Sequence, residues 1–178
     1  MCSSDLRGNH EDAWIRVLDE GFPGFVLPKG NGCAACMRSY GQDPSDTEAL
    51  LTGAFWPADV VTWMRALPHW YEDEHALYVH AGLPRVGDRW LHPRDVRPPS
   101  TLLWTRAREF FSDYHGKPVV VGHTATNVLP PELSGFTPED PDDLWVRDPV
   151  WAIDTGCGRG GFLTAVELPA RRVWESRV

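Results

Sequence analysis

Apolar residues recur along this chain in two patterns, which predict helices in some segments and strands in others. In residues 11–21, Trp14, Val17 and Leu18 fall at helical spacing, and residues 57–67 repeat that spacing with a proline in the first turn. Short apolar runs predict strands instead, and they occupy residues 76–79, 118–121, 150–153, 162–168 and 172–175. The second of these runs is apolar throughout, which is typical of a strand covered on both faces, and the last two are close enough to pair as a hairpin.

The segments between these elements are rich in proline, glycine or charged residues. Residues 22–41 and 84–99 are predicted to be loops, and the acidic, proline-rich residues 127–149 a solvated loop or surface insertion. Residues 102–111 are predicted to form one further helix. No repeat or domain boundary is visible, so we expect a single domain over residues 1–178, of α/β class with an antiparallel C-terminal part.

Composition narrows the class of protein. An apolar content of 42% and a charged content of 24% are ordinary for a soluble globular chain. The net charge of -8 argues against a general nucleic-acid-binding surface, and no apolar run reaches the length of a membrane span. Residues 1–6 have neither the basic end nor the apolar core of a signal peptide. We therefore expect a cytoplasmic protein without a nucleic-acid or membrane partner, and the sequence leaves its oligomeric state open.

The four cysteines are Cys2, Cys33, Cys36 and Cys157, too few for a disulfide scaffold and compatible with a reducing cytoplasm. Cys33 and Cys36 have the C-x-x-C spacing of zinc and redox sites. A zinc site needs a second pair, and none exists. A redox pair usually opens a helix after a strand, whereas this pair follows a glycine-rich loop, so we expect plain thiols.

Five residues suggest chemistry. His80 and His123 each follow a short apolar run, and Asn9 and His10 lie together in a Gly-Asn-His-Glu block. One amide oxygen and two imidazoles suit a borderline divalent metal such as Mn, Fe or Zn, and α/β sheets place ligands at the ends of strands. His10 would remain available as an acid or base, and Arg106 could bind a phosphate through its planar guanidinium.

Each of these residues also has an ordinary structural interpretation. A single histidine after a strand is more often packed or exposed than a metal ligand. An asparagine after a glycine is commonly a turn residue, and an arginine on a helix commonly faces solvent. Taken singly, the five residues would not establish a site.

The order of the motifs, in contrast, resembles the later motifs of the calcineurin-like metallophosphoesterases. The closest resemblance is to the bacterial serine/threonine protein phosphatase group, with the diadenosine tetraphosphatases nearby, and it extends from residue 6 to residue 168. The motifs that carry it are Gly-Asn-His-Glu at 8–11, Val-His-Ala-Gly-Leu at 79–83, Leu-Leu-Trp-Thr-Arg at 102–106, Val-Gly-His-Thr at 121–124, Ile-Asp-Thr-Gly-Cys at 153–157 and Gly-Gly at 160–161.

The resemblance implies a four-layer α/β/β/α sandwich, N-terminally truncated here, and a two-metal centre. Asn9, His80 and His123 would be ligands of the second metal, with Mn expected and Fe or Zn as alternatives. His10 would protonate the leaving alkoxide or lie near the attacked phosphorus, and Arg106 would bind phosphate oxygens. The implied reaction is in-line attack of a metal-activated water on a phosphate ester.

Two short motifs also match the sequence patterns of other kinds of site. The triplet at 154–156 mimics an aspartic protease, but such a site needs two copies and would leave the other motifs unexplained. Gly156, Gly158 and Gly161 fit G-x-G-x-x-G, yet a strand-like run follows them where a dinucleotide site requires a helix. The resemblance instead makes Asp154 structural, orienting a loop under the site, and the glycines a tight loop from which Arg159 could reach the substrate.

The chain also departs from the family pattern. It contains neither Asp-x-His-Gly nor Gly-Asp-x-x-Asp-Arg-Gly, the motifs that supply the first metal's ligands, the bridging carboxylate and another arginine. The three remaining ligands are all neutral, so we expect one metal to bind weakly, the second not at all, and this chain to be a fragment with little activity.

Three functions therefore remain. The first is a phosphatase for phosphoserine and phosphothreonine in proteins, and the second is a hydrolase of diadenosine polyphosphates. The third belongs to a different class: a catalytically dead module that binds phosphoproteins or another partner. Sequence upstream of residue 1 would discriminate a truncated enzyme from a degenerate module.

Overall fold

The structure, a computed structural model, describes residues 5–27 and 30–177. The chain divides into two compact units, which are described separately. One comprises Arg7–Leu67, and the other comprises Pro68–Val178 with the residues before Arg7. The single domain over residues 1–178 stays a prediction. Among the described residues, no helix combines the length and hydropathy that a membrane crossing requires.

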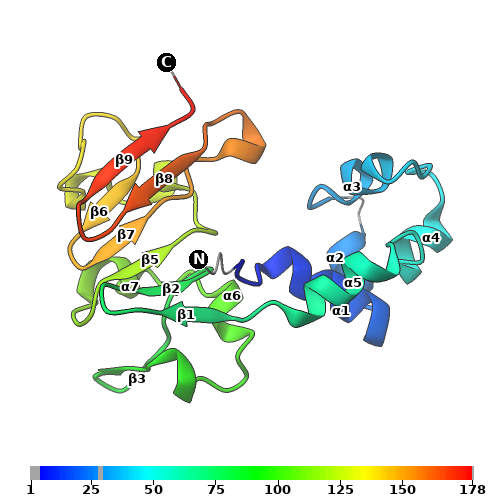
Figure 1. The fold of residues 1–178 in the computed structure, drawn as a ribbon, viewed down its shortest axis with the longest axis horizontal. Helices are drawn as coiled ribbons and strands as arrows, with labels where there is room; N and C mark the ends of the chain where they lie inside the picture. Colours follow the sequence, from blue (N-terminus) through cyan, green and yellow to red (C-terminus); the bar gives the residue numbers. More distant parts are fainter. Residues whose placement is uncertain (1–4, 28–29, 178) are drawn as a thin grey trace. The chain divides into compact units, whose positions relative to one another are not determined.

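A five-stranded sheet in the order β1-β2-β5-β7-β6 forms the centre of the second unit (Figure 1). Its three inner strands are parallel, and an antiparallel strand lies at each edge. Parallel strands next to one another are typical of α/β folds, so the α/β class is confirmed. The strands are β1 (Trp70–Glu72), β2 (Leu77–Val79), β5 (Val119–Val121), β7 (Val150–Ala152) and β6 (Trp145–Arg147).

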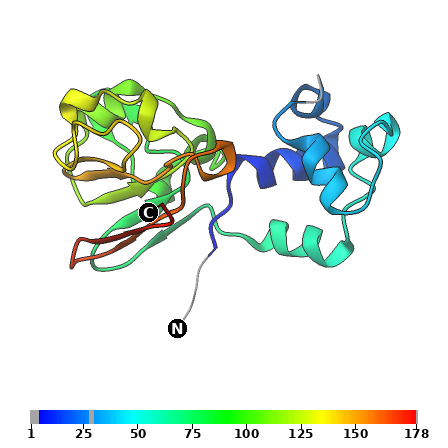
Figure 2. The ribbon, with the colours of Figure 1, turned by 90° about the horizontal axis from the view of Figure 1, so that it is seen from above.

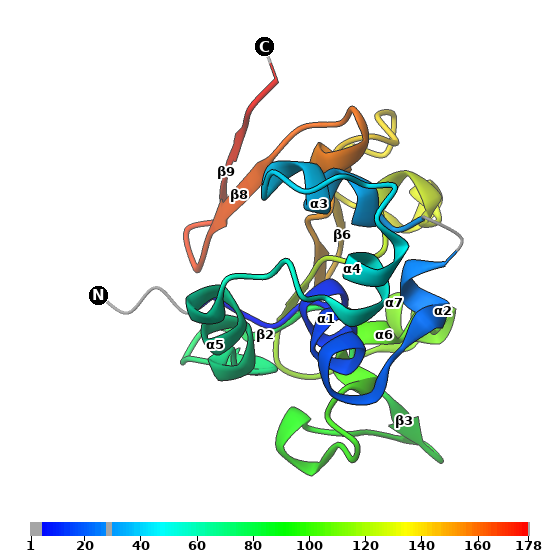
Figure 3. The ribbon, with the colours of Figure 1, turned by 90° about the vertical axis from the view of Figure 1, so that its right-hand side faces the viewer.

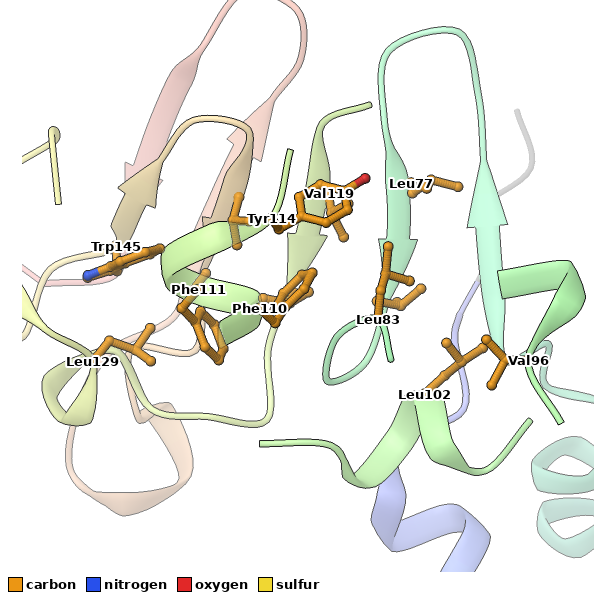
Figure 4. Packing of buried hydrophobic residues seen from close by; sticks show 14 residues of the cluster. Leu77, Leu83, Val96, Leu102, Phe110, Phe111, Tyr114, Val119, Leu129 and Trp145 are labelled. Atoms are coloured by element: carbon orange, nitrogen blue, oxygen red, sulfur yellow. The ribbon is translucent and has the colours of Figure 1, made fainter. Parts of the chain in front are cut away.

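Alternate residues of the sheet point to its two faces and build two cores. On one face, Val119, Val121 and Val150 pack against the phenylalanines of α7 (Arg108–Asp113), as Figure 4 shows for part of this cluster. On the other face, Val120 and Trp151 pack with residues of the hairpin formed by two further strands. These strands are β8 (Thr164–Glu167) and β9 (Arg172–Glu175).

The hairpin prediction is confirmed, because β8 and β9 pair antiparallel along their whole length. Figure 2 shows this hairpin in red, turned by 90° from the view of Figure 1. The sheet is thus covered by helix on one face and by hairpin on the other. The four-layer sandwich itself stays a prediction.

The prediction of one continuous helix over residues 102–111 is wrong, because the helix is interrupted in the middle of this range. Two short helices replace it, α6 (Thr101–Trp104) and α7, with extended backbone at Thr105. In a continuous helix the Leu102 carbonyl would accept the N–H of Arg106. Here it accepts the N–H of Ala81 at 2.9 Å, so the hydrogen bond that would continue the helix goes to the segment after β2.

The loop predictions for residues 84–99 and 127–149 also need correction. The first contains a small hairpin around Gly87, and the second contains β6, whose Trp145 and Val146 are buried. Short strands with few apolar residues do not stand out from proline-rich surroundings. The elements involved are β3 (Arg85–Val86), β4 (Arg89–Trp90) and the 3-10 turns η1 (Pro93–Asp95), η2 (Thr126–Val128) and η3 (Pro131–Leu133).

The other unit is helical in its described residues, and Figure 3 labels the helices α1 to α5 found there. The helices predicted at 11–21 and 57–67 are confirmed, while the loop predicted at 22–41 contains two helices. Burial of Cys33 and Met37, one turn apart, stabilises the second of these despite the glycines before it. The helices are α1 (Asn9–Glu20), α2 (Pro23–Val26), α3 (Cys33–Ser39), α4 (Thr47–Thr52) and α5 (Ala58–Ala66).

Within this unit two arginines join α1 to α5. Arg65 makes a bidentate pair with Asp19, at 2.8 and 2.5 Å, and this pair holds the pKa of the Asp19 carboxyl below its usual value. The guanidinium of Arg7 donates to the carbonyls of Met64 and Arg65 at the end of α5, where helix carbonyls lack partners. The start of α1, which carries Asn9 and His10, is thereby fixed against α5.

Candidate functional site

The three parallel strands end beside one another, and a chemically functional residue follows each. His80 comes directly after β2, His123 two residues after β5, and Asp154 two residues after β7. Backbone hydrogen bonds of 2.9 Å, from the Gly122 N–H to the His80 carbonyl and from the Ile153 N–H to the Val121 carbonyl, continue the pairing past the strands. The predicted position of His80 and His123 at strand ends is therefore confirmed, and this edge is where α/β sheets bind ligands.

His123 lies at the centre of a tight turn with an unusual backbone conformation. Its φ is 65°, and the Thr124 N–H donates to the Gly122 carbonyl at 2.7 Å, which closes a three-residue turn. A γ-turn with positive φ is rare and strained for a residue with a Cβ atom. Such strain persists where the surrounding structure requires a side chain in one particular direction.

The turn directs the His123 imidazole to His80. The Nε2 atom of His80 lies 3.2 Å from the Nδ1 atom of His123, and the ring centroids are 5.0 Å apart. Trp104, at the end of α6, packs edge-on against the His123 ring with centroids 6.2 Å apart. Trp104 could not be predicted as a site residue from its sequence position, since only contact with a residue that follows a distant strand gives it significance.

This pair of nitrogens suits a shared metal ion. Metal–imidazole bonds of about 2.0–2.1 Å place two nitrogens on one metal roughly 3 Å apart, close to the distance between His80 and His123. The described part of the chain contains no group of three or more His, Cys, Asp or Glu side chains placed to hold a metal. Two histidine nitrogens therefore lie at a distance that suits a shared ion.

Asp154 is part of the loop rather than of the histidine pair. Its Oδ1 atom accepts the Gly156 N–H at 3.2 Å, and its carbonyl accepts the Thr126 N–H at 2.9 Å. Asp154 thus connects the segment after β7 with the segment after His123. This geometry agrees with the loop-orienting role that the resemblance implies.

The glycine-rich loop after Asp154 is closed on itself. Thr155 Oγ1 bonds to the Phe162 carbonyl at 2.6 Å and lies 2.8 Å from Thr164 Oγ1, and Gly161 donates to the Gly156 carbonyl at 2.9 Å. The loop contains the 3-10 turn η4 (Cys157–Arg159), and β8 follows it. The prediction that a strand rather than a helix follows the G-x-G-x-x-G sequence is confirmed, which argues against a dinucleotide-binding site at these glycines.

The loop borders a cavity of about 570 Å³. The lining residue nearest to His123 in the sequence is Ala125. Arg159 is exposed, and its side chain makes no hydrogen bond or ion pair with residues 5–27 or 30–177. Arg177, in contrast, pairs with three carboxylates and packs over the Phe162 ring. Arg159 is thus the arginine of this cavity with a guanidinium available to a ligand. The cavity is lined by Ala125, Asn127, Val128, Asp142, Thr155, Gly156, Arg159, Gly160, Gly161, Phe162 and Arg177.

Gly161→Ala should open this loop. A Cβ atom at Gly161 would lie 2.0 Å from the Thr155 carbonyl oxygen, which belongs to the backbone and cannot move aside cheaply. We expect a loss of about 1–3 kcal/mol in the free energy of unfolding, measured by urea denaturation. Gly158→Ala is the matched control, because a Cβ atom there meets nothing within 4 Å. Equal stability of the two variants would contradict the close approach.

The remaining predicted site residues lie on other segments. Arg106 is exposed in the break between α6 and α7, and within the described structure its side chain has no hydrogen bond or ion pair. In the helical unit, Asn9 is the first residue of α1 and is 9% exposed, while the exposed His10 packs edge-on against Phe25 at 5.3 Å. The metal set Asn9, His80 and His123 as a whole stays a prediction.

Among the described cysteines, Cys33, Cys36 and Cys157 are free thiols, while Cys2 lies outside the described residues. That the C-x-x-C pair is neither a zinc site nor a redox site stays a prediction. Contrary to expectation, the C-x-x-C pair does open a helix, α3. Burial raises the pKa of the Cys33 thiol, and burial together with the nearby Cys33 and Glu11 raises the pKa of Cys36 to about 11. Since the thiolate is the reactive form, Cys33 and Cys36 should be poor nucleophiles at neutral pH.

Alkylation of the native protein with iodoacetamide should reflect these pKa values. At pH 7, Cys157 should react far faster than Cys36, because Cys157 is exposed and the Cys36 thiol stays protonated. The Cys36 rate should rise about tenfold per pH unit toward a pH of about 11, in step with its thiolate fraction. Peptide mapping by mass spectrometry separates the sites, and equal rates for Cys36 and Cys157 at pH 7 would contradict the protected environment of α3.

No protein-family profile matches the sequence, and no curated protein matches it. The structure is similar to a crystal structure described as that of a "putative diadenosine tetraphosphatase", with a TM-score of 0.54 and 20% sequence identity. The match covers 97% of this chain and 67% of that chain. At this identity the similarity shows a shared fold.

Proposed function

We propose that this protein is a metal-dependent phosphoesterase whose metal is held by His80 and His123. The observation that carries this proposal is the convergence of two imidazole nitrogens, 3.2 Å apart, at the carboxyl edge of a parallel sheet. The strained backbone at His123 supports it, because positive φ at a histidine is maintained at a structural cost. The shared fold adds independent support.

The chain's own residues would have distinct tasks. His80 and His123 would hold the metal, with Asn9 as a third ligand, and Mn is the ion we propose first, with Fe or Zn as alternatives. When bound, the metal would polarise the phosphate ester and acidify a water molecule. His10 would donate a proton to the leaving alkoxide.

Two arginines, Arg106 and Arg159, would bind the substrate. The guanidinium forks of Arg106 and Arg159 match the geometry of phosphate oxygens and are free of ion pairs within the described structure. The cavity beside Arg159 would take the part of the substrate beyond the phosphate. We propose a phosphorylated serine or threonine of a protein as substrate, and a diadenosine polyphosphate as the second candidate, which the similar solved structure favours.

We further propose that the chain of 178 residues is weakly active. Asn9, His80 and His123 are all neutral, and a divalent cation bound by neutral ligands alone keeps an uncompensated charge. Weak metal binding would leave few molecules competent for hydrolysis. A binding module for phosphorylated partners, without catalysis, is the corresponding non-enzymatic proposal.

Hydrolysis of 4-nitrophenyl phosphate with added MnCl₂ tests these proposals. We expect little or no turnover from the 178-residue chain, and no turnover from His80→Ala. Robust turnover that His10→Ala abolishes would overturn the proposal of weak activity while supporting the role of His10. Turnover unchanged by His80→Ala would overturn the proposed metal centre. Binding of a phosphoserine peptide without turnover, lost in Arg159→Ala, would favour the binding module.

A further inference from the structure

Three carboxylates surround one guanidinium at the end of the β8–β9 hairpin. Arg177, two residues after β9, donates to Glu175 at 2.7 Å and to Asp140 at 2.8 Å, and a third carboxylate, that of Asp143, lies 3.6 Å away. Glu175 is the last residue of β9, whereas Asp140 and Asp143 belong to the acidic loop of residues 137–143. One positive charge therefore faces three carboxylates, so the cluster carries an excess of negative charge if all three are ionised.

Two of these carboxylates differ in the donors that reach them. The Asp143 side chain is 6% exposed, and its two oxygens accept the Leu144 N–H and the Thr137 hydroxyl. The Glu175 side chain is 20% exposed, and its Oε2 atom accepts from Arg177. The Oε1 atom of Glu175 is inaccessible to solvent and receives no hydrogen bond from residues 5–27 or 30–177. A buried carboxylate oxygen without a donor is unfavourable, so the ionised form of Glu175 is poorly stabilised.

A proton on Glu175 satisfies this arrangement. The side chains of Glu175 and Asp143 are in hydrogen-bond contact, and two carboxyl groups can form such a bond only when one of them is protonated. Burial raises the pKa of Glu175 above its ordinary value of 4.5, and the contact with Asp143 raises it too, while the pairing with Arg177 opposes both. Asp140 stays ionised, because the Arg177 guanidinium holds the pKa of that carboxyl below its usual value. Glu175 is therefore the group that carries the proton, and Asp143 accepts it in a hydrogen bond.

The acidic loop also forms part of the wall of the cavity beside Arg159. Asp142 lines that cavity and accepts a hydrogen bond from Asn127, another lining residue, at 3.3 Å. Arg177 lines the same cavity. Because Asp142 directly precedes Asp143 in the chain, the contacts that hold the loop on the end of β9 also fix this part of the cavity wall.

We infer that Glu175 and Asp143 form a pH-sensitive latch between β9 and the acidic loop. While Glu175 is protonated, its carboxyl donates to Asp143 and the latch is closed. Loss of the proton places two like charges in contact at a largely buried position, and their repulsion moves the loop away from β9. The charged groups around Glu175 are Asp140 and Asp143 from the loop and Arg177 after β9, and its partner on β8 is the uncharged Thr164. The latch does not depend on the proposed metal centre.

The latch should open as the pH rises. A carboxyl whose pKa is higher in the folded than in the unfolded chain stabilises the fold fully below the unfolded pKa, and this contribution is lost as the pH rises through the folded pKa. An NMR titration of the full chain follows the side-chain carboxyl ¹³C signal of Glu175, assigned with Glu175→Gln. We expect its midpoint to lie above 4.5, and the backbone amide signals of Asp142 and Asp143 to shift with that same midpoint.

Asp143→Asn separates the latch from an effect of burial alone. It removes the neighbouring charge at nearly constant size, so the Glu175 midpoint should fall toward 4.5, whereas a shift caused only by burial would persist. Glu175→Gln should remove the component of the loop amide shifts that has the Glu175 midpoint, because a neutral amide can donate to Asp143 at every pH.

Glu167→Gln is the matched control, because Glu167 lies on the same hairpin and pairs with Arg172 instead. It should leave the Glu175 midpoint and the loop amide shifts unchanged, and retained NMR dispersion checks that all variants are folded. A Glu175 midpoint at or below 4.5, a midpoint unchanged in Asp143→Asn, or loop amide shifts that keep the Glu175 midpoint in Glu175→Gln would each overturn the inference.

Discussion

His123→Ala should lower the affinity of the protein for Mn²⁺ at least about 100-fold. Removal of a group that only orients a metal ligand already costs about 10–100-fold in affinity, and loss of the ligand itself should cost more. The single imidazole of His80 would then remain, because the nitrogen 3.2 Å away would be gone. Isothermal titration calorimetry, or an electron paramagnetic resonance titration of free Mn²⁺, measures the affinity.

His115→Ala is the control for this experiment. His115 is exposed in the loop after α7, and its Nδ1 atom lies 3.0 Å from the carbonyl of Asp113, the last residue of that helix. Removal of a surface imidazole should not change Mn²⁺ affinity if binding occurs at the proposed centre. Equal losses in His115→Ala and His123→Ala would mean that the metal binds nonspecifically to histidines, and no loss in His123→Ala would contradict the proposed ligand.

Phe110→Ala should destabilise the sheet unit by about 3–5 kcal/mol, the range for a buried phenylalanine that leaves a cavity. Phe110 is 1% exposed, and its ring contacts those of Phe111, Tyr114 and Trp90 at centroid distances of 5.3–5.9 Å. The Phe110 ring also packs against Gly82, so the cavity left by its removal would adjoin the segment after His80. Chemical denaturation monitored by far-UV circular dichroism measures the change.

The control for Phe110→Ala is Leu163→Ala. Leu163 is 62% exposed, so its truncation should change the free energy of unfolding by less than about 0.5 kcal/mol. A change below about 1 kcal/mol for Phe110→Ala would show that α7 is not packed on the sheet as described. A large change for both variants would indicate that Leu163, directly before β8, contributes more to stability than its exposure suggests.

The inner strands of the sheet could be predicted, because the apolar pattern that indicates each strand lies within the residues of that strand. The three valines of β5 are buried on both faces, and an uninterrupted apolar run predicts such a strand. The edge strand β6 could not be predicted, since its pattern is interrupted by charge and follows a long acidic segment. Helix α4 had local signals, with Asp46 accepting the Ala49 N–H and Gly53 ending the helix, but its apolar face is too short to stand out.

The candidate site could be predicted only in part, for a related reason. That His80 and His123 end strands follows from the apolar runs before them. That they meet depends on the register between β2 and β5 and on the left-handed turn at His123, and neither is encoded by spacing. The helix break that exposes Arg106 depends on a hydrogen bond from Ala81, a residue distant in sequence. Long-range contacts of this kind determine the geometry of the site, and they leave no pattern in the local sequence.

The central claim is that His80 and His123 hold a metal ion together. The most direct measurement is an anomalous difference map from crystals of the 178-residue chain soaked in MnCl₂. We predict a peak within bonding distance of both His80 Nε2 and His123 Nδ1, absent in crystals of His123→Ala. A map with ordered His80 and His123 side chains and no peak between them would contradict the claim.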